Sequence, residues 1–380
     1  MAPPVARRAA RAMRMKMRCG TGSCLAAVGL WLALLWGGAS AQAQALPSPP
    51  STPLTSSPLL GAASGASRQA WAAAAGLSRG IGLVAALESS TPLSEGREIA
   101  DTLAQAGFRS VRLTVPQASL RALAGLQNRE QAARLKELDA MVDALLARGL
   151  SVVLALRNEP GHGAAASTVQ DKGGSAGPAR HREAMVIWQH LAQRYATRPQ
   201  RLLFEVSLVP GGTGAVKNQR MSSLLKAIRQ SDATRVVVVG WSEAVGVSEL
   251  RVPADRHLIV GITHAEPFRF IRQGAPGVSG SDLWRGSTCC SPQEKQLMAL
   301  PLDIVHAWSL EHRYPVWVQE FSSYQDIPAE LRARHARLVR QAAEERGLPW
   351  AYGDWSGEFG VYDPVRREWE PSMLRALTGP

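Results

Sequence analysis

From about residue 70 onward, short hydrophobic runs alternate with longer amphipathic stretches. Eight runs have the length and the β-branched content of buried strands: 80–86, 108–115, 150–157, 201–208, 235–241, 257–264, 315–321 and 348–354. Helical periodicity separates most of them, at 97–106, 130–148, 182–196, 217–231, 293–312 and 328–346. This alternation predicts an α/β fold with a parallel sheet. Eight strands favour a closed (β/α)8 TIM barrel over an open sheet.

The N-terminal segment has a different pattern. Six basic residues in the first 18 precede the apolar run "CLAAVGLWLALLW" at 24–36. The following "GGASAQAQA" offers cleavage after Ala41, Ala43 or Ala45. This layout is typical of a secretory signal peptide, and the apolar run is short for an uncleaved membrane anchor. We therefore expect a signal peptide at 1–41, export to the periplasm or the extracellular space, and no stable membrane insertion after cleavage.

A segment rich in Pro, Ser and Ala follows the expected signal peptide. Residues 42–68 show no hydrophobic periodicity, which indicates a flexible linker. The remaining residues, 69–380, then form a single barrel domain, which we expect to be monomeric.

The positive charge of the chain is concentrated near its start. Of the +12 formal charge, six positives lie in the first 18 residues, and their removal leaves 37 basic and 31 acidic residues, or +6. No basic stripe with interleaved aromatic residues follows, which argues against a nucleic-acid partner. The 46% hydrophobic content is enough for a large core.

Cofactor chemistry has little support in the sequence. Cys289 and Cys290 remain after removal of the signal peptide, and two sulfurs are too few for a structural zinc site. Two possibilities remain open: the neighbouring cysteines form a disulfide with each other, or both are free thiols. No metal-binding or nucleotide-binding motif occurs in a suitable context, so we expect no metal and no cofactor.

The residues at the ends of two predicted strands bear on whether the protein is catalytic. In barrel enzymes the active site lies at the carboxyl ends of the strands. Glu320 ends the strand in "YPVWVQEFSSY" and fits one of the two carboxylates that a retaining glycosidase places about 5 Å apart. The strand in "RLLFEVSLVPGG" instead ends with apolar Leu208 and Val209 before Pro210.

Several ordered motifs resemble those of the family 5 glycoside hydrolases, the cellulase-like (β/α)8 barrels. "GFRSVRLTV" is similar to the family's G-F-x-x-V-R-x-P-V, and "LLFEVSLVP" to its L-x-F-E-x-x-N-E-P. "EPFRFIRQGAPGV" resembles P-F-x-F-T-H-Q-G-A, and "YPVWVQEFSSY" resembles P-[VI]-x-x-G-E-F-G. The resemblance spans about 78–377 and implies a barrel that acts on β-linked glycans.

The resemblance assigns roles residue by residue. Glu320 matches the nucleophile and Arg112 the arginine that supports it. The family's Asn-Glu pair is replaced by Leu208 and Val209, so the acid/base position is vacant at Val209. Losing a general acid lowers the rate roughly 10²–10⁴-fold, which predicts weak or absent hydrolysis by the usual mechanism.

Other family positions also differ. The histidine after the third strand is replaced by Arg157 or Asn158, and the aromatic platform of the eighth strand aligns with Gly353, two residues before Trp355. Three carboxylates near strand ends are candidates to replace the missing acid: Glu159, Glu243 and Glu266.

The expected ligand is a β-glycan in a groove at the barrel mouth. Candidate substrate-binding side chains are His264, Trp241, Trp284, Tyr324 and Trp355, because aromatic rings can stack on sugar faces. Three functions remain open at this point. They are a degenerate barrel that binds glycans, a retaining β-glycosidase with a relocated acid, and a non-catalytic scaffold for protein interaction.

Overall fold

The computed structural model describes residues 65–84, 96–124, 129–157, 176–207 and 213–379. Within them, eight parallel strands close into a barrel in sequence order, with β1 paired to β8. The strands are β1 (Gly80–Val84), β2 (Ser110–Pro116), β3 (Ser151–Arg157), β4 (Leu202–Ser207), β5 (Val237–Glu243), β6 (Leu258–His264), β7 (Val316–Phe321) and β8 (Trp350–Tyr352). The predicted (β/α)8 barrel is confirmed.

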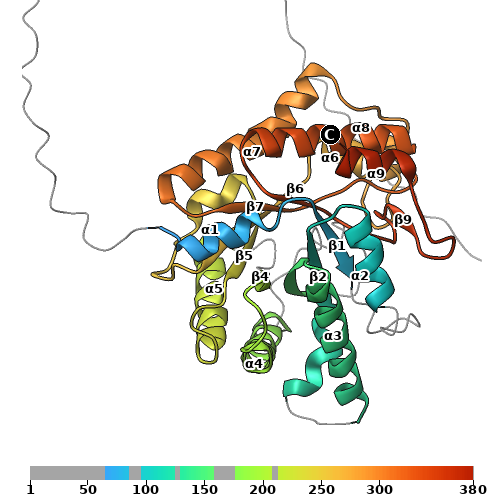
Figure 1. Cartoon of the computed structure of the whole chain (residues 1–380). Helices are drawn as coiled ribbons and strands as arrows, with labels where there is room; N and C mark the ends of the chain where they lie inside the picture. Colours follow the sequence, from blue (N-terminus) through green and yellow to red (C-terminus); the bar gives the residue numbers. More distant parts are fainter. Residues whose placement is uncertain (1–64, 85–95, 125–128, 158–175, 208–212, 380) are drawn as a thin grey trace, which may run out of the picture. The chain divides into compact units, whose positions relative to one another are not determined.

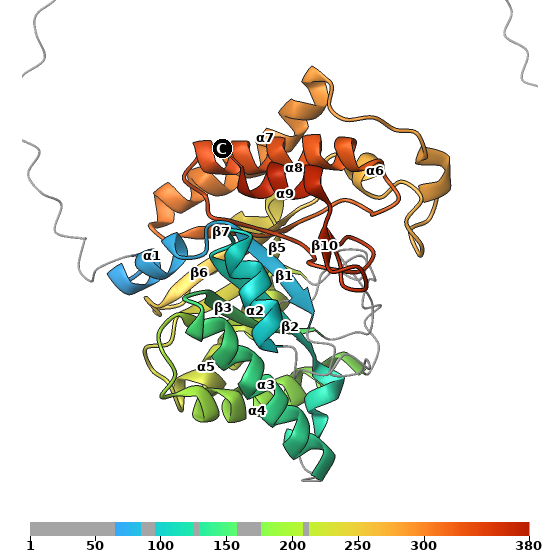
Figure 2. The ribbon, with the colours of Figure 1, turned by 45° about the vertical axis from the view of Figure 1, so that its right-hand side comes forward.

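Helices surround these strands (Figures 1 and 2). They are α1 (Arg68–Ala75), α2 (Gly96–Gln105), α3 (Arg129–Ala147), α4 (Ala176–Tyr195), α5 (Gly214–Arg229), α6 (Phe268–Ile271), α7 (Pro292–His312), α8 (Ala329–Glu345) and α9 (Pro371–Thr378). The six predicted helices correspond to α2, α3, α4, α5, α7 and α8. Helices α1, α6 and α9, and the hairpin of β9 (Tyr362–Asp363) and β10 (Glu368–Trp369), were not predicted.

Helix α1 covers the end of the barrel at which the strands begin. Ala70, Ala74 and Leu77 join a buried cluster with strand residues that include Leu203 and Trp317. The side chain of Ser67 caps the helix by accepting a hydrogen bond from the Ala70 N–H at 3.1 Å. The folded part therefore includes the last residues of the expected linker. The expected signal peptide, and the expected linker up to residue 64, lie outside the described residues.

The barrel interior changes from apolar to charged toward its mouth, the end where the strands reach their carboxyl termini. Because side chains alternate along a strand, Glu205 follows Leu203 on the interior face of β4. Glycines on neighbouring strands leave room for these polar groups. A Cβ on Gly240 would lie 3.0 Å from Glu205 Oε1, and one on Gly261 would lie 2.0 Å from Gln319 Oε1.

An irregularity in β7 directs Glu320 toward the mouth. Ile262 of β6 is opposite Val318, but the next residue, Thr263, is opposite Glu320. The extra residue is Gln319, which is buried on the interior side next to Gly261. Such bulges re-aim side chains, frequently beside active sites.

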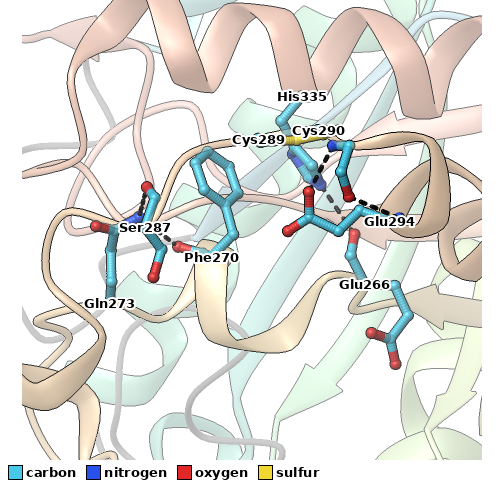
Figure 3. Close-up of a disulfide and its surroundings, with 9 residues drawn as sticks. Glu266, Phe270, Gln273, Ser287, Cys289, Cys290, Glu294 and His335 are labelled. Atoms are coloured by element: carbon cyan, nitrogen blue, oxygen red, sulfur yellow. Dashed lines mark hydrogen bonds between the residues drawn. A yellow bond between two sulfur atoms is a disulfide. The ribbon is translucent and has the colours of Figure 1, made fainter.

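The loop between β6 and α7 contains the two remaining cysteines. Cys289 and Cys290 are buried and joined by a disulfide (Figure 3). Nearby, the ring centroid of Phe270 lies 5.5 Å from that of His335, and burial lowers the pKa of His335 to about 4. Of the two states that the sequence left open, the structure has the disulfide.

None of the helices within the described ranges combines the length and apolar character needed to cross a bilayer.

Candidate active site

Arg112 joins two carboxylates at the barrel mouth. Its Nε and Nη2 donate to the two oxygens of Glu205 at 2.6 and 2.7 Å, and its Nη1 donates to Glu320 Oε2 at 3.0 Å. Ser207 Oγ donates a further bond of 2.7 Å to Glu205 Oε1. Arg112, Glu205 and Glu320 come from β2, β4 and β7, so barrel closure is what assembles them.

The burial of these groups differs in a way that separates their roles. The Glu205 side chain has no exposed surface, whereas those of Arg112 and Glu320 are 14% and 16% exposed. Burial alone would lower the pKa of Arg112, but the charges of Glu205 and Glu320 and the hydrogen bonds to Glu205 raise it above its usual value. Glu205 thus anchors a permanent cation, and Glu320 presents its carboxylate to the mouth.

A further carboxyl group, that of Asp354, is close enough to Glu320 to interact with its charge. Asp354 follows β8 by two residues and is partly buried. Burial and the negative charge of Glu320 raise the pKa of Asp354 to about 7, against the opposing effect of Arg157, Arg112 and Arg272. The sequence-based search for a second carboxylate missed Asp354, although it is the last residue of the predicted strand 348–354.

Two more arginines belong to this charged cluster. The side chain of Arg272 is almost completely buried, with its guanidinium carbon 4.4 Å from the ring centroid of Phe359. Its Nε and Nη1 have no hydrogen-bond partner among the described residues. Burial lowers the pKa of Arg272, and the charges of Glu320 and Asp354 oppose that effect. Arg157, at the end of β3, also acts on the charge of Asp354.

The three carboxylates considered as substitutes are placed unequally. Glu266 Oε2 accepts a hydrogen bond from the Phe268 N–H at 3.3 Å, at the start of α6. Glu243 ends β5, but its side chain lies outside the described residues, as do Glu159 and Val209.

The candidate sugar-binding side chains lie in different surroundings. Trp241 is buried against α5, with Lys217 Nζ 5.1 Å from its ring centroid, and buried His264 Nε2 lies 2.8 Å from the Met298 carbonyl of α7. Trp355 follows Asp354 and stacks on Tyr362 with a centroid distance of 4.7 Å. The remaining two, Tyr324 and Trp284, contact Phe359 and Phe268 with centroid distances of 5.8 Å in both pairs.

Metal ligation has no support in the described ranges, where no group of three or more His, Cys, Asp or Glu side chains is arranged to hold an ion.

A closed (β/α)8 barrel with a carboxylate at the end of β7, held by an arginine, defines a glycoside-hydrolase class of site. The family model that matches is the cellulase family, glycosyl hydrolase family 5, over residues 83–359. This chain belongs to that family. The predicted resemblance is confirmed.

Related proteins support the same assignment. Endoglucanase H of Acetivibrio thermocellus is 26% identical over 205 residues, which cover 51% of this chain and 22% of that protein. Endoglucanase A of Clostridium longisporum is 24% identical over 274 residues, 67% of this chain and 50% of that protein. The matched segments thus span about a fifth and about half of these relatives.

Solved structures show the same fold. Endoglucanase Cel5A of Thermotoga maritima has a TM-score of 0.71 and 27% identity, covering 81% of this chain and 99% of that one. Its complexes with cellobiose and with mannotriose each have a TM-score of 0.68, at 25% and 26% identity, with the same coverage of both chains.

Proposed function

We propose that this protein acts on β-linked glycans bound in the barrel mouth, with Glu320 as the nucleophile. The observation that carries this proposal is the hydrogen bond of 3.0 Å from Arg112 Nη1 to Glu320 Oε2. It fixes one carboxylate oxygen while Glu320 stays partly exposed to the mouth. The cellobiose and mannotriose complexes of Cel5A support a β-linked oligosaccharide as the ligand class.

The usual proton donor is missing from this mechanism. Val209 occupies the acid/base position of the family motif, and an alkyl side chain cannot protonate a leaving group. Linkages with poor leaving groups depend most strongly on such an acid. We therefore expect turnover of activated glycosides, and turnover of natural linkages only if another carboxyl group supplies the proton.

The test is hydrolysis of dinitrophenyl β-cellobioside by the purified protein, since this leaving group needs no proton. We expect turnover that the Glu320→Gln variant lacks and that Glu98→Gln, a change on the exposed surface of α2, retains. Equal rates for the wild type and Glu320→Gln would refute the assignment of Glu320.

Glycan binding without hydrolysis is the second candidate, favoured by the valine at the acid/base position. It predicts that calorimetry detects cello-oligosaccharide binding to a protein that releases no dinitrophenolate.

We also propose that the protein is exported, because residues 1–41 have the layout of a signal peptide. Mass spectrometry of the protein isolated from its native host should find a mature N-terminus after Ala41, Ala43 or Ala45. An intact N-terminus would contradict export by signal cleavage.

A further inference from the structure

Backbone hydrogen bonds hold the chain on both sides of Asp354 at the barrel mouth. The N–H of the preceding residue, Gly353, donates to the Phe321 carbonyl at 2.9 Å, and the N–H of Trp355 donates to the Gly82 carbonyl at 2.7 Å. A Cβ on Gly353 would lie 3.4 Å from Glu320 Cγ. The segment that carries Asp354 therefore continues β8 between β7 and β1, and Gly353 faces the side chain of Glu320.

The charged groups around Asp354 come from four other segments. Glu320 of β7 has the same charge, whereas Arg112 of β2, Arg157 of β3 and Arg272 after α6 have the opposite charge. Burial and Glu320 disfavour an ionised Asp354, so its pKa is raised to about 7. The mouth thus holds one carboxylate bound by Arg112 and a neighbouring carboxyl group that carries a proton up to about neutral pH.

Two other described carboxylates, Glu205 and Glu266, are less suited to proton transfer. Glu205 is fully buried, and both of its oxygens already accept hydrogen bonds from Arg112. Glu266 binds a backbone N–H at the start of α6. A carboxylate bound by an arginine, next to a carboxyl group whose pKa is raised, is the pattern of a nucleophile and an acid.

We propose that Asp354 is a catalytic residue that supplies the proton Val209 cannot supply. This inference rests on the proposed function. A Glu320 oxygen forms a bond to the anomeric carbon as the bond from that carbon to the leaving oxygen breaks, and that oxygen takes the Asp354 proton. Water then attacks the anomeric carbon and gives a proton to the Asp354 carboxylate, while the bond to Glu320 breaks. The net reaction is hydrolysis, and both side chains return to their starting states.

The test compares Asp354→Asn with Asp303→Asn, a control on the outer helix α7, on two substrates. Phenyl β-cellobioside has a poor leaving group and needs the acid, whereas dinitrophenyl β-cellobioside does not. We expect Asp354→Asn to lower kcat/KM for the phenyl substrate about 10²-fold or more and for the dinitrophenyl substrate by less than about fivefold. The wild-type rate on the phenyl substrate should fall as the pH rises through about 7, and the variant should lack this decline.

Azide provides an independent readout. It attacks the glycosyl-enzyme without needing a base, so it should accelerate dinitrophenyl cellobioside turnover by Asp354→Asn, with cellobiosyl azide as the product. Azide should have little effect on the wild type or on Asp303→Asn.

The two proposals fail in different ways. Glu320-dependent turnover of the dinitrophenyl substrate, combined with equal losses on both substrates or no loss in Asp354→Asn, overturns the role of Asp354 alone. No wild-type turnover of either substrate overturns the proposed function and this role together.

Discussion

Arg112 and Glu205 form a two-pronged ion pair inside the barrel, with nitrogen–oxygen distances of 2.6 and 2.7 Å. The pair occupies both Glu205 oxygens and leaves only Arg112 Nη1 for Glu320. Glu205 therefore acts on Glu320, the proposed nucleophile, through the orientation of Arg112.

Glu205→Gln should lower the free energy of unfolding by about 3 kcal/mol, because it leaves the Arg112 charge buried without its main partner. Urea denaturation measures this change. The control is Glu98→Gln, which breaks an exposed ion pair with Arg367 of 3.2 Å and should cost less than about 1 kcal/mol. Losses of similar size in the two variants would contradict the anchoring role of Glu205.

Arg112→Lys should reduce kcat on dinitrophenyl β-cellobioside roughly 10- to 100-fold with little change in KM. Lysine keeps the charge but cannot bind Glu205 and Glu320 through a rigid fork, so the nucleophile loses its orientation. Steady-state kinetics tests this expectation. Arg367→Lys, on the exposed surface, should retain the wild-type kcat, and a fully active Arg112→Lys would show that the fork is dispensable.

Gly82→Ala should destabilise the closure of the barrel. A Cβ at this position would lie 1.5 Å from the Gly353 carbonyl oxygen, and a backbone group cannot move aside without opening the seam between β1 and β8. We expect a loss of at least about 2 kcal/mol by urea denaturation. Gly96→Ala is the matched control because the atoms nearest to its Cβ would be those of Met141, at the ordinary contact distances of 3.4–3.5 Å. Equal stabilities for the two variants would refute this prediction.

Asp354 should make stability depend on pH. Its pKa is about 7 in the folded protein and near 3.9 in an unfolded chain. Its contribution to stability is therefore fully present below about pH 4 and is lost as the pH rises through 7. Between pH 5 and pH 8, the free energy of unfolding of the wild type should fall by about 1–2 kcal/mol more than that of Asp354→Asn, allowing for solvent screening. Parallel pH profiles of the two proteins would contradict the raised pKa.

Periodicity and motif order were sufficient to predict the architecture and the position of Glu320. Eight apolar runs became eight strands because a strand buried on both faces must be apolar along its length. The family motifs around Arg112 and Glu320 are local, so the resemblance pointed to both residues, and the structure places them 3.0 Å apart. The short helices α1 and α6 and the hairpin of β9 and β10 were missed, since tertiary contacts stabilise such short elements.

The sequence by itself determined the barrel and the family. Only the tertiary structure decided which charged groups meet. Asp354 and Glu320 are 34 positions apart in the chain, and the pairing of β8 with β7 brings their strand ends together. The buried position of Glu205, the buried guanidinium of Arg272 and the outward packing of Trp241 have the same origin. Burial and the proximity of charges depend on how the strands close, and no local pattern of residues encodes that.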